Sequence, residues 1–199
     1  MSEQSKGPIG RHLDQSLAAL HRATKDPALC AVADAIADAM VRALRAGGKI
    51  LIIGNGGSAG DAQHIAAELA GRYKKERPAL AAIALTTDTS ALTAISNDYG
   101  FDRVFVRQIE ALGRAGDVLL ALSTSGRSPN ILEALKFARE RGLVTIGFTG
   151  SKGEAMRPLC DHLMMAPTDD TPIIQQIYLT FGHAICDAVE QVMAGEPPR

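Results

Sequence analysis

Two short loops rich in glycine and hydroxyl side chains could hold the oxygens of a phosphate and of a small polyol. Residues 54–59 read GNGGSA and residues 123–130 read STSGRSPN, and each loop stands between an apolar run and a helix-like run. Four of the six residues from Ser123 to Ser128 carry a hydroxyl, whereas a helix N-cap needs only one. Hydroxyls and the free N–H groups at a helix N-terminus can surround a phosphate without a fixed counter-charge. The second loop therefore predicts a phosphate-binding site.

The helix that follows the first loop carries side chains suited to proton transfer and metal binding. Asp61, His64 and Glu68 are spaced three and four residues apart, which places them on one face of an α-helix. A histidine and a carboxylate at i and i+4 can both reach one divalent metal ion, and a glutamate beside a sugar phosphate can carry protons. The structural alternative is a capping box between Ser58 and Asp61, with His64 and Glu68 as a weak exposed pair.

The first loop and a later turn also allow other interpretations. GNGGSA fits the G-x-G-x-x-A pattern of dinucleotide-binding loops, and Asp88 follows the second apolar run, where a ribose-binding acid would lie. A nicotinamide fold does not require the second phosphate-type loop, which disfavours this interpretation, and a purely structural glycine turn is a further alternative. Asn97 and Asp98 either form a helix C-terminal turn or bind sugar hydroxyls.

These motifs are set in an alternating pattern of strands and helices. Apolar runs at 50–53, 81–85, 118–122 and 143–148, with a weaker run at 162–165, predict five strands. Before them, Leu13, Leu17 and Leu20 recur at helical spacing, and a second helix ends at the glycines 47 and 48. Near-continuous apolar strands separated by helices predict an α/β fold, a doubly wound parallel sheet flanked by helices, in which ligands bind at the carboxyl ends of the strands.

The long last helix, opened by Pro172, is apolar on two sides. A core stripe is predicted for Ile174, Ile177, Phe181, Ile185, Ala188 and Val192, and the other side holds Leu179, Cys186 and Met193. Two apolar sides predict burial by a second subunit. Gln175 and His183 lie about 12 Å apart along this helix, so both reach one site only through long side chains or from two subunits. A polar pair within an interface is the alternative.

The composition is typical of a globular protein. The 199 residues are 46% hydrophobic and 22% charged with a net charge of -1, which gives no long-range attraction for nucleic acid. We expect a single domain over residues 1–199, with a mobile segment at 1–12 and a frayed tail at 195–199. Three scattered cysteines and the lack of an apolar run of about 20 residues indicate neither a disulfide framework nor a membrane span. The expected compartment is the cytoplasm.

Together these residues resemble the sugar isomerase (SIS) family, and within it the phosphoheptose isomerase branch. The resemblance covers almost the whole chain and also rests on LTTD at 85–88, NDYG at 97–100, GFTG at 147–150, and Gln175 with His183. It implies conversion of sedoheptulose 7-phosphate to D-glycero-D-manno-heptose 7-phosphate, the first step of heptose supply for lipopolysaccharide or other surface glycans. It also implies a homotetramer with active sites at subunit interfaces.

The resemblance further implies roles for individual residues. Zinc would be held by His64, Glu68, Gln175 and His183. The substrate would be contacted by Asn55, Gly56, Gly57, Ser58, Glu68, Asn97, Asp98, Ser123, Thr124, Ser125, Ser128 and Gln175. We assign Glu68 as the base at carbon and His183 as the acid–base partner at oxygen in an enediol mechanism. A metal-bound glutamate is a poorer base, so the two roles of Glu68 compete.

Two alternatives to this function use the same fold. One is a non-catalytic regulator that binds a phosphosugar or a protein, such as the type associated with the bacterial replication initiator. Such a regulator would not need Glu68 and His183 together. The other is an isomerase of a shorter sugar phosphate, and only the length of the pocket would separate it from a heptose enzyme.

Overall fold

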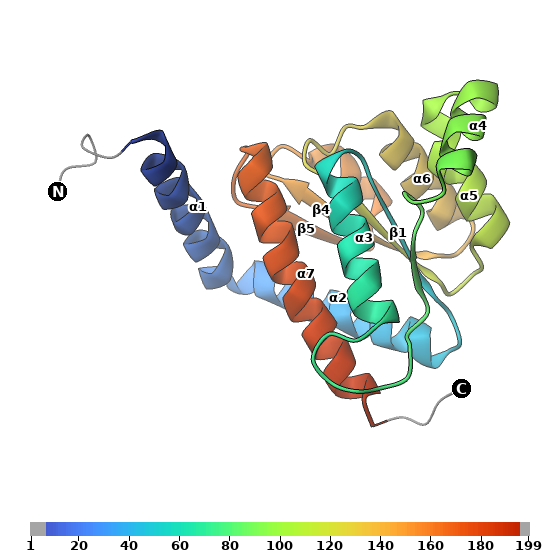
Figure 1. The fold of residues 1–199 in the computed structure, drawn as a ribbon, viewed down its shortest axis with the longest axis horizontal. Helices are drawn as coiled ribbons and strands as arrows, with labels where there is room; N and C mark the ends of the chain where they lie inside the picture. The colour runs from blue at the N-terminus through green and yellow to red at the C-terminus, as the bar shows by residue number, and fades with distance from the viewer. Residues whose placement is uncertain (1–6, 196–199) are drawn as a thin grey trace.

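A five-stranded, all-parallel β-sheet forms the centre of the computed structural model, which describes residues 7–195 (Figure 1). The strands are β1 (Ile50–Gly54), β2 (Ala82–Ala84), β3 (Val118–Ser123), β4 (Val144–Gly150) and β5 (His162–Ala166). Their order in the sheet is β2-β1-β3-β4-β5, and each neighbouring pair is parallel. The predicted doubly wound α/β fold is confirmed.

Helices connect the strands, and several begin where the sequence supplies a proline. They are α1 (Pro8–Lys25), α2 (Pro27–Arg45), α3 (Gly57–Ala70), α4 (Thr89–Tyr99), α5 (Val104–Leu112), α6 (Pro129–Glu140) and α7 (Thr171–Met193), with short 3₁₀ turns η2 (Phe101–Arg103) and η3 (Glu154–Leu159). Because α1 begins at Pro8, helix occupies residues 8–12 of the segment that we expected to be mobile. The rest of that segment before Gly7, and the tail after Gly195, lie outside the described residues.

Two hydrophobic cores cover the two faces of the sheet. Along β1, Ile50 and Ile52 pack into the core under α2, α3 and α7, whereas Leu51 and Ile53 pack into the core under α5 and α6. All four side chains are fully buried. Both faces of the strand are apolar because helices cover both, which is why the sequence shows continuous apolar runs rather than alternation.

The two glycine- and hydroxyl-rich loops meet at one edge of this sheet. Strands β1 and β3 are neighbours, and Gly54 at the end of β1 pairs in register with Leu122 near the end of β3. The chain leaves β1 for α3 on one face of the sheet and leaves β3 for α6 on the other. This is the point at which doubly wound sheets bind ligands.

The apolar surface of α7 is buried differently from the sequence prediction. Cys186 and Met193 are buried by the same chain, whereas Val192, predicted for the core, is 45% exposed. The reason is that α7 packs against both α2 and α3, so two of its sides are covered without a second subunit. α7 has 23 residues, but neither it nor any other helix within residues 7–195 combines the length and the apolar composition that a membrane span requires.

The first helix instead carries an uncovered apolar stripe. Ile9, Leu13 and Leu17 are spaced four residues apart on α1, and each is more than 60% exposed. Figure 1 shows α1 projecting from the layered part of the molecule, with only its later residues close to it. The leucine spacing therefore predicted the helix correctly, but the stripe does not belong to the core of the chain.

Candidate active site

Side chains from α3 and α7 converge in a small cluster of two imidazoles and one carboxylate. His64 Nε2 lies 2.8 Å from His183 Nε2, and Glu68 Oε1 lies 3.3 Å from His64 Nε2. One ligand atom from each of the three residues falls within 4.8 Å of the other two. The predicted shared face of His64 and Glu68 is confirmed, and tertiary packing adds His183 to it.

This cluster offers the donor set of a catalytic metal centre. Two histidine nitrogens and one carboxylate oxygen are a ligand combination that zinc takes in enzymes, with a fourth position open for water or substrate. His64 is exposed, and Glu68 and His183 are half-buried, so a small ligand can reach all three. Zinc therefore fits the residues that are present.

Close packing between the two helices brings the cluster together. Ala62, Ile65 and Leu69 lie on the buried face of α3. Ile65 packs on Gly182 of α7, where an added Cβ would lie 3.1 Å from the Ile65 Cδ1 atom. Because Gly182 has no side chain, α7 can approach α3 closely, and the next residue, His183, reaches His64.

Asp61 does not form the capping box that was the structural alternative. Gly56 is the N-cap of α3, and Asp61 is 9% exposed, with an Oδ2 atom that accepts no hydrogen bond from the described residues. Burial raises the pKa of the Asp61 carboxyl to about 6, while the charge of His64 lowers it by less. Asp61 is thus a buried acid close to the cluster rather than a helix cap.

A buried carboxylate organises the turn that follows α3. Glu190 of α7 is fully buried and accepts hydrogen bonds from the backbone nitrogens of Tyr73, Lys74 and Lys75 at 2.8, 2.7 and 2.6 Å. Arg77 Nε donates to the same carboxylate at 3.1 Å. Burial alone would raise the pKa of Glu190, but these N–H groups and the Arg77 charge outweigh it, so the pKa lies below its ordinary value.

The same turn touches the cluster itself. The Tyr73 ring stacks on His183 with 5.5 Å between ring centroids and 24° between planes. Arg77 Nη2 donates to the backbone carbonyl of Glu68 at 2.8 Å. Sequence reasoning missed Tyr73, Arg77 and Glu190, since no local spacing indicates that a residue near the chain end will anchor the turn after α3.

The loop after β3 places its hydroxyls beside the N-terminus of α6, and one of them, Ser125 Oγ, accepts a hydrogen bond from the Arg127 nitrogen at 3.2 Å. Ser128 is the N-cap of α6, yet among the described residues its hydroxyl meets Ser123 Oγ at 3.4 Å rather than capping the helix. Gly126 has a φ of +64°, a conformation that glycine adopts without strain, and it allows the loop to fold back. Ser125 is exposed and Thr124 is half-buried. This geometry suits an anion at the positive end of α6.

The loop after β1 has a similar build and is tied to the second loop. Gly56 has a φ of +55° at the start of α3. The Asn55 side chain exchanges two hydrogen bonds, each 2.9 Å long, with Asn130 in the first turn of α6. The structure therefore brings Asn55 and residues 56–58 to the same edge as residues 123–128, although sequence reasoning gave Asn130 no role.

Three other predicted residues lie outside the cluster of His64, Glu68 and His183. Gln175 packs against Gly57, where an added Cβ would collide with its amide, so it lies beside the start of α3. Asn97 and Asp98, at the end of α4, are exposed and hydrogen bonded to each other at 2.8 Å. Figure 1 shows α4, which carries both residues, well apart from α7, which carries His183. Their substrate contacts, and metal binding by Gln175, stay predictions.

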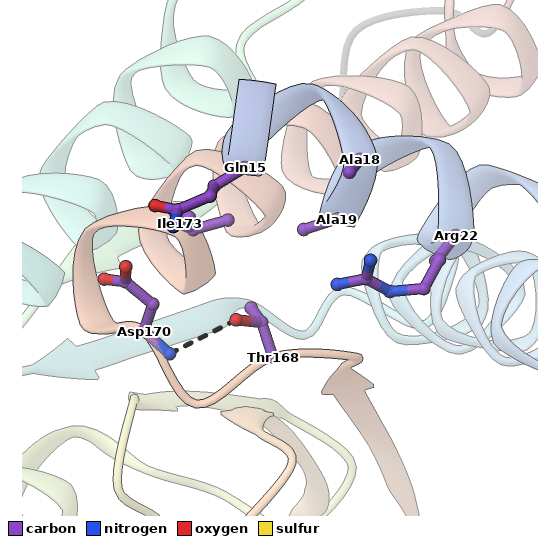
Figure 2. Close-up of a pocket in the computed structure, with 7 residues that line it drawn as sticks. All are labelled: Gln15, Ala18, Ala19, Arg22, Thr168, Asp170 and Ile173. Atoms are coloured by element: carbon purple, nitrogen blue, oxygen red, sulfur yellow. Dashed lines mark hydrogen bonds between the residues drawn. The ribbon is translucent and has the colours of Figure 1, made fainter. Parts of the chain in front are cut away.

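Two further features bear on alternative sites. Asp88, the possible ribose-binding acid, is the N-cap of α4 and accepts a hydrogen bond from the Ala91 nitrogen at 2.9 Å, so it has a structural role. A pocket of about 290 Å³ lies between α1 and the start of α7 (Figure 2). It is lined by Gln15, Ala18, Ala19, Arg22, Thr168, Asp170 and Ile173. None of the predicted site residues lines it.

Comparison with known proteins identifies the family. The SIS domain model matches residues 12–150. A phosphoheptose isomerase of Bradyrhizobium sp. (strain ORS 278) is 65% identical over 193 residues, which cover 97% of this chain and 98% of that one. The structure of phosphoheptose isomerase from Neisseria gonorrhoeae superposes with a TM-score of 0.86 at 46% identity, covering 92% of this chain and 97% of that one. The structure of a phosphoheptose isomerase from Francisella tularensis superposes with a TM-score of 0.87 at 36% identity, covering 96% of this chain and 100% of that one. The chain belongs to the phosphoheptose isomerases of the SIS domain family.

Proposed function

We propose that the cluster of His64, Glu68 and His183 carries out the isomerisation of a heptose phosphate. As a phosphoheptose isomerase, the chain is an aldose–ketose isomerase that converts sedoheptulose 7-phosphate to D-glycero-D-manno-heptose 7-phosphate, for heptose and lipopolysaccharide synthesis. The observation that carries the residue assignment is the convergence of a carboxylate and two imidazoles, 2.8 to 3.3 Å apart, from two packed helices.

The chemistry requires two groups that exchange protons. Moving the carbonyl from C2 to C1 removes a proton from C1, passes through an enediol and returns a proton to C2, while protons also move between the two oxygens. Glu68 acts as the base at carbon, and His183 donates and accepts protons at oxygen. The half-buried position of both side chains supports this assignment, since partial exclusion of water favours proton transfer between enzyme and substrate.

The phosphate end of the substrate binds at the loop between β3 and α6. The hydroxyls of Ser123, Thr124, Ser125 and Ser128 and the free N–H groups of α6 receive its oxygens. Asn55, Gly56, Gly57 and Ser58, at the neighbouring strand end, line the path from the phosphate toward the cluster. This arrangement is supported by the parallel register of β1 and β3, which sets both loops at one sheet edge.

A zinc ion is part of the proposal. His64, Glu68 and His183 would hold it, with Gln175 as a fourth ligand. When bound, zinc polarises the substrate carbonyl and stabilises the negative charge that develops on oxygen. Gln175 approaches α3 at Gly57, about three helical turns before Glu68, so a fourth ligand from this residue requires a different rotamer or a second subunit.

We further propose a homotetramer in the cytoplasm, with active sites at subunit interfaces. The exposed stripe of Ile9, Leu13 and Leu17 on α1 supports association, because apolar patches of this kind mark protein interfaces. A second subunit would also supply Asn97 and Asp98, which lie at the end of α4, a helix that stands apart from α7. Three cysteines without disulfides are in keeping with a reducing compartment.

One incubation tests reaction, substrate and metal together. The purified protein is mixed with sedoheptulose 7-phosphate, with and without excess chelator, and the aldose product is detected by NMR. We expect product formation that chelator abolishes and zinc restores, and much lower turnover of pentulose and hexulose phosphates. No product with zinc present would refute the proposed reaction, and full activity in chelator would refute the metal.

A further inference from the structure

Asn55 and Asn130 form a reciprocal amide pair. Asn55 Nδ2 donates to Asn130 Oδ1 and Asn130 Nδ2 donates to Asn55 Oδ1, both at 2.9 Å. The residues are 75 positions apart in the sequence. Asn130 is 1% exposed, whereas Asn55 is half-buried, so Asn55 is the member of the pair that a ligand can reach.

The pair fixes the orientation of both side chains. Each amide uses one N–H and one oxygen lone pair for its partner, and each retains a second N–H and a second lone pair. Rotating either amide by half a turn would place two N–H groups or two oxygens against each other. Neither side chain can therefore turn alone without losing both hydrogen bonds. The loss would leave the Asn130 amide, which is almost completely buried, without these two bonds.

The pair also joins the two halves of the proposed site. Asn55 directly follows β1 and stands two residues before α3, the helix that carries His64 and Glu68. Asn130 is the second residue of α6, and only Pro129 separates it from the proposed phosphate-binding loop at 123–128. A single side-chain contact thus links the start of the catalytic helix to the loop that holds the phosphate.

We propose that Asn130 is a positioning residue, which holds the Asn55 amide toward the sugar and sets the separation between the phosphate loop and the catalytic cluster. This inference rests on the proposed function. At 1% exposure Asn130 does not contact the substrate and acts through Asn55. A sugar phosphate must span both loops to react, whereas inorganic phosphate occupies only the second loop. Loss of Asn130 therefore weakens binding of the sugar phosphate more than binding of phosphate.

Steady-state kinetics of Asn130→Ala, Asn55→Ala and the double variant test this role. We expect Asn130→Ala to raise KM about tenfold, the size expected for loss of one or two hydrogen bonds, with kcat within about threefold of the wild type. The competitive inhibition constant of inorganic phosphate should stay within about twofold. The KM of the double variant should exceed the KM of Asn55→Ala by less than about twofold, because the side chain through which Asn130 acts is already gone.

A matched control separates positioning from general loss of stability. Thr145 is also fully buried and hydrogen bonded, to Asp161, but it lies near the start of β4, at the edge of the sheet away from both loops. Thr145→Val should lower the melting temperature without a change in KM. If Asn130→Ala does not fold, Asn130→Ser, which keeps a small polar side chain, is measured in the same way and carries the same expectations.

Several results would overturn the inference. One is an equal rise in KM with and without Asn55, and another is a rise in the phosphate inhibition constant as large as the rise in KM. A wild-type KM in Asn130→Ala, while Asn55→Ala raises KM, would also overturn it and leave the proposed function intact. An inactive wild-type enzyme, in contrast, would mean that the proposed function itself is wrong.

Discussion

Replacing Glu190 by glutamine should strongly destabilise the protein. The carboxylate is fully buried and accepts three backbone N–H groups and the Nε of Arg77. Two of these donors bond to each oxygen, and in a glutamine side chain one oxygen becomes an amide nitrogen that cannot accept. Arg77, whose side chain is 1% exposed, also loses its counter-charge.

The expected cost follows from this uncompensated charge. Removing one partner of a buried ion pair costs about 3–5 kcal/mol of unfolding free energy. For a chain of this size, each kcal/mol corresponds to about 2–4 °C, so the melting temperature should fall by about 6–20 °C. The position of Tyr73 against His183 depends on the same turn, and activity should therefore fall as well.

Urea and thermal unfolding followed by circular dichroism, at one fixed protein concentration, measure this effect. The control is Glu154→Gln, which removes an exposed ion pair with Arg157 and should leave the free energy of unfolding nearly unchanged, because solvent screens that pair. Because the pKa of Glu190 is lowered in the folded state, its stabilisation is present above the unfolded pKa of about 4.3 and is lost as pH falls further. A loss below about 1 kcal/mol at pH 7 would refute the reasoning.

Three further predictions concern the site. Glu68→Gln should abolish turnover while calorimetry still detects substrate binding, and His183→Ala should lose activity comparably; full activity in Glu68→Gln would exclude it as the base. Ser125→Ala should raise KM about fivefold with kcat retained, from one lost phosphate contact, and an unchanged KM would count against the loop. Asp61→Asn, unfolded in excess chelator at pH 7.5, should be about 1–3 kcal/mol more stable than the wild type, because burial penalises ionised Asp61. This gain should vanish as pH falls from 6 toward 3.8, and a gain that persists at pH 4 would contradict the assigned pKa.

Local sequence patterns were sufficient to predict the strands, the two loops at their ends, and the part of the candidate site that lies on α3. The apolar runs marked all five strands, and glycine with hydroxyl residues marked both loops at the strand ends. The i and i+4 spacing placed His64 and Glu68 on one face of α3. These features are determined by the sequence because backbone periodicity and turn conformation depend on neighbouring residues.

Only the tertiary structure decided which distant side chains meet. The family resemblance groups His183 with His64, but only the close packing of α7 on α3 at Gly182 shows how the two side chains meet across 119 residues. Asn130 contacts Asn55, and Glu190 anchors the turn at 73–77, although no spacing of residues in the sequence predicts either contact. The same packing buried Cys186 and exposed Val192 against the predicted stripe. Such pairings are set by how helices cover the sheet, a property of the whole chain that no local period encodes.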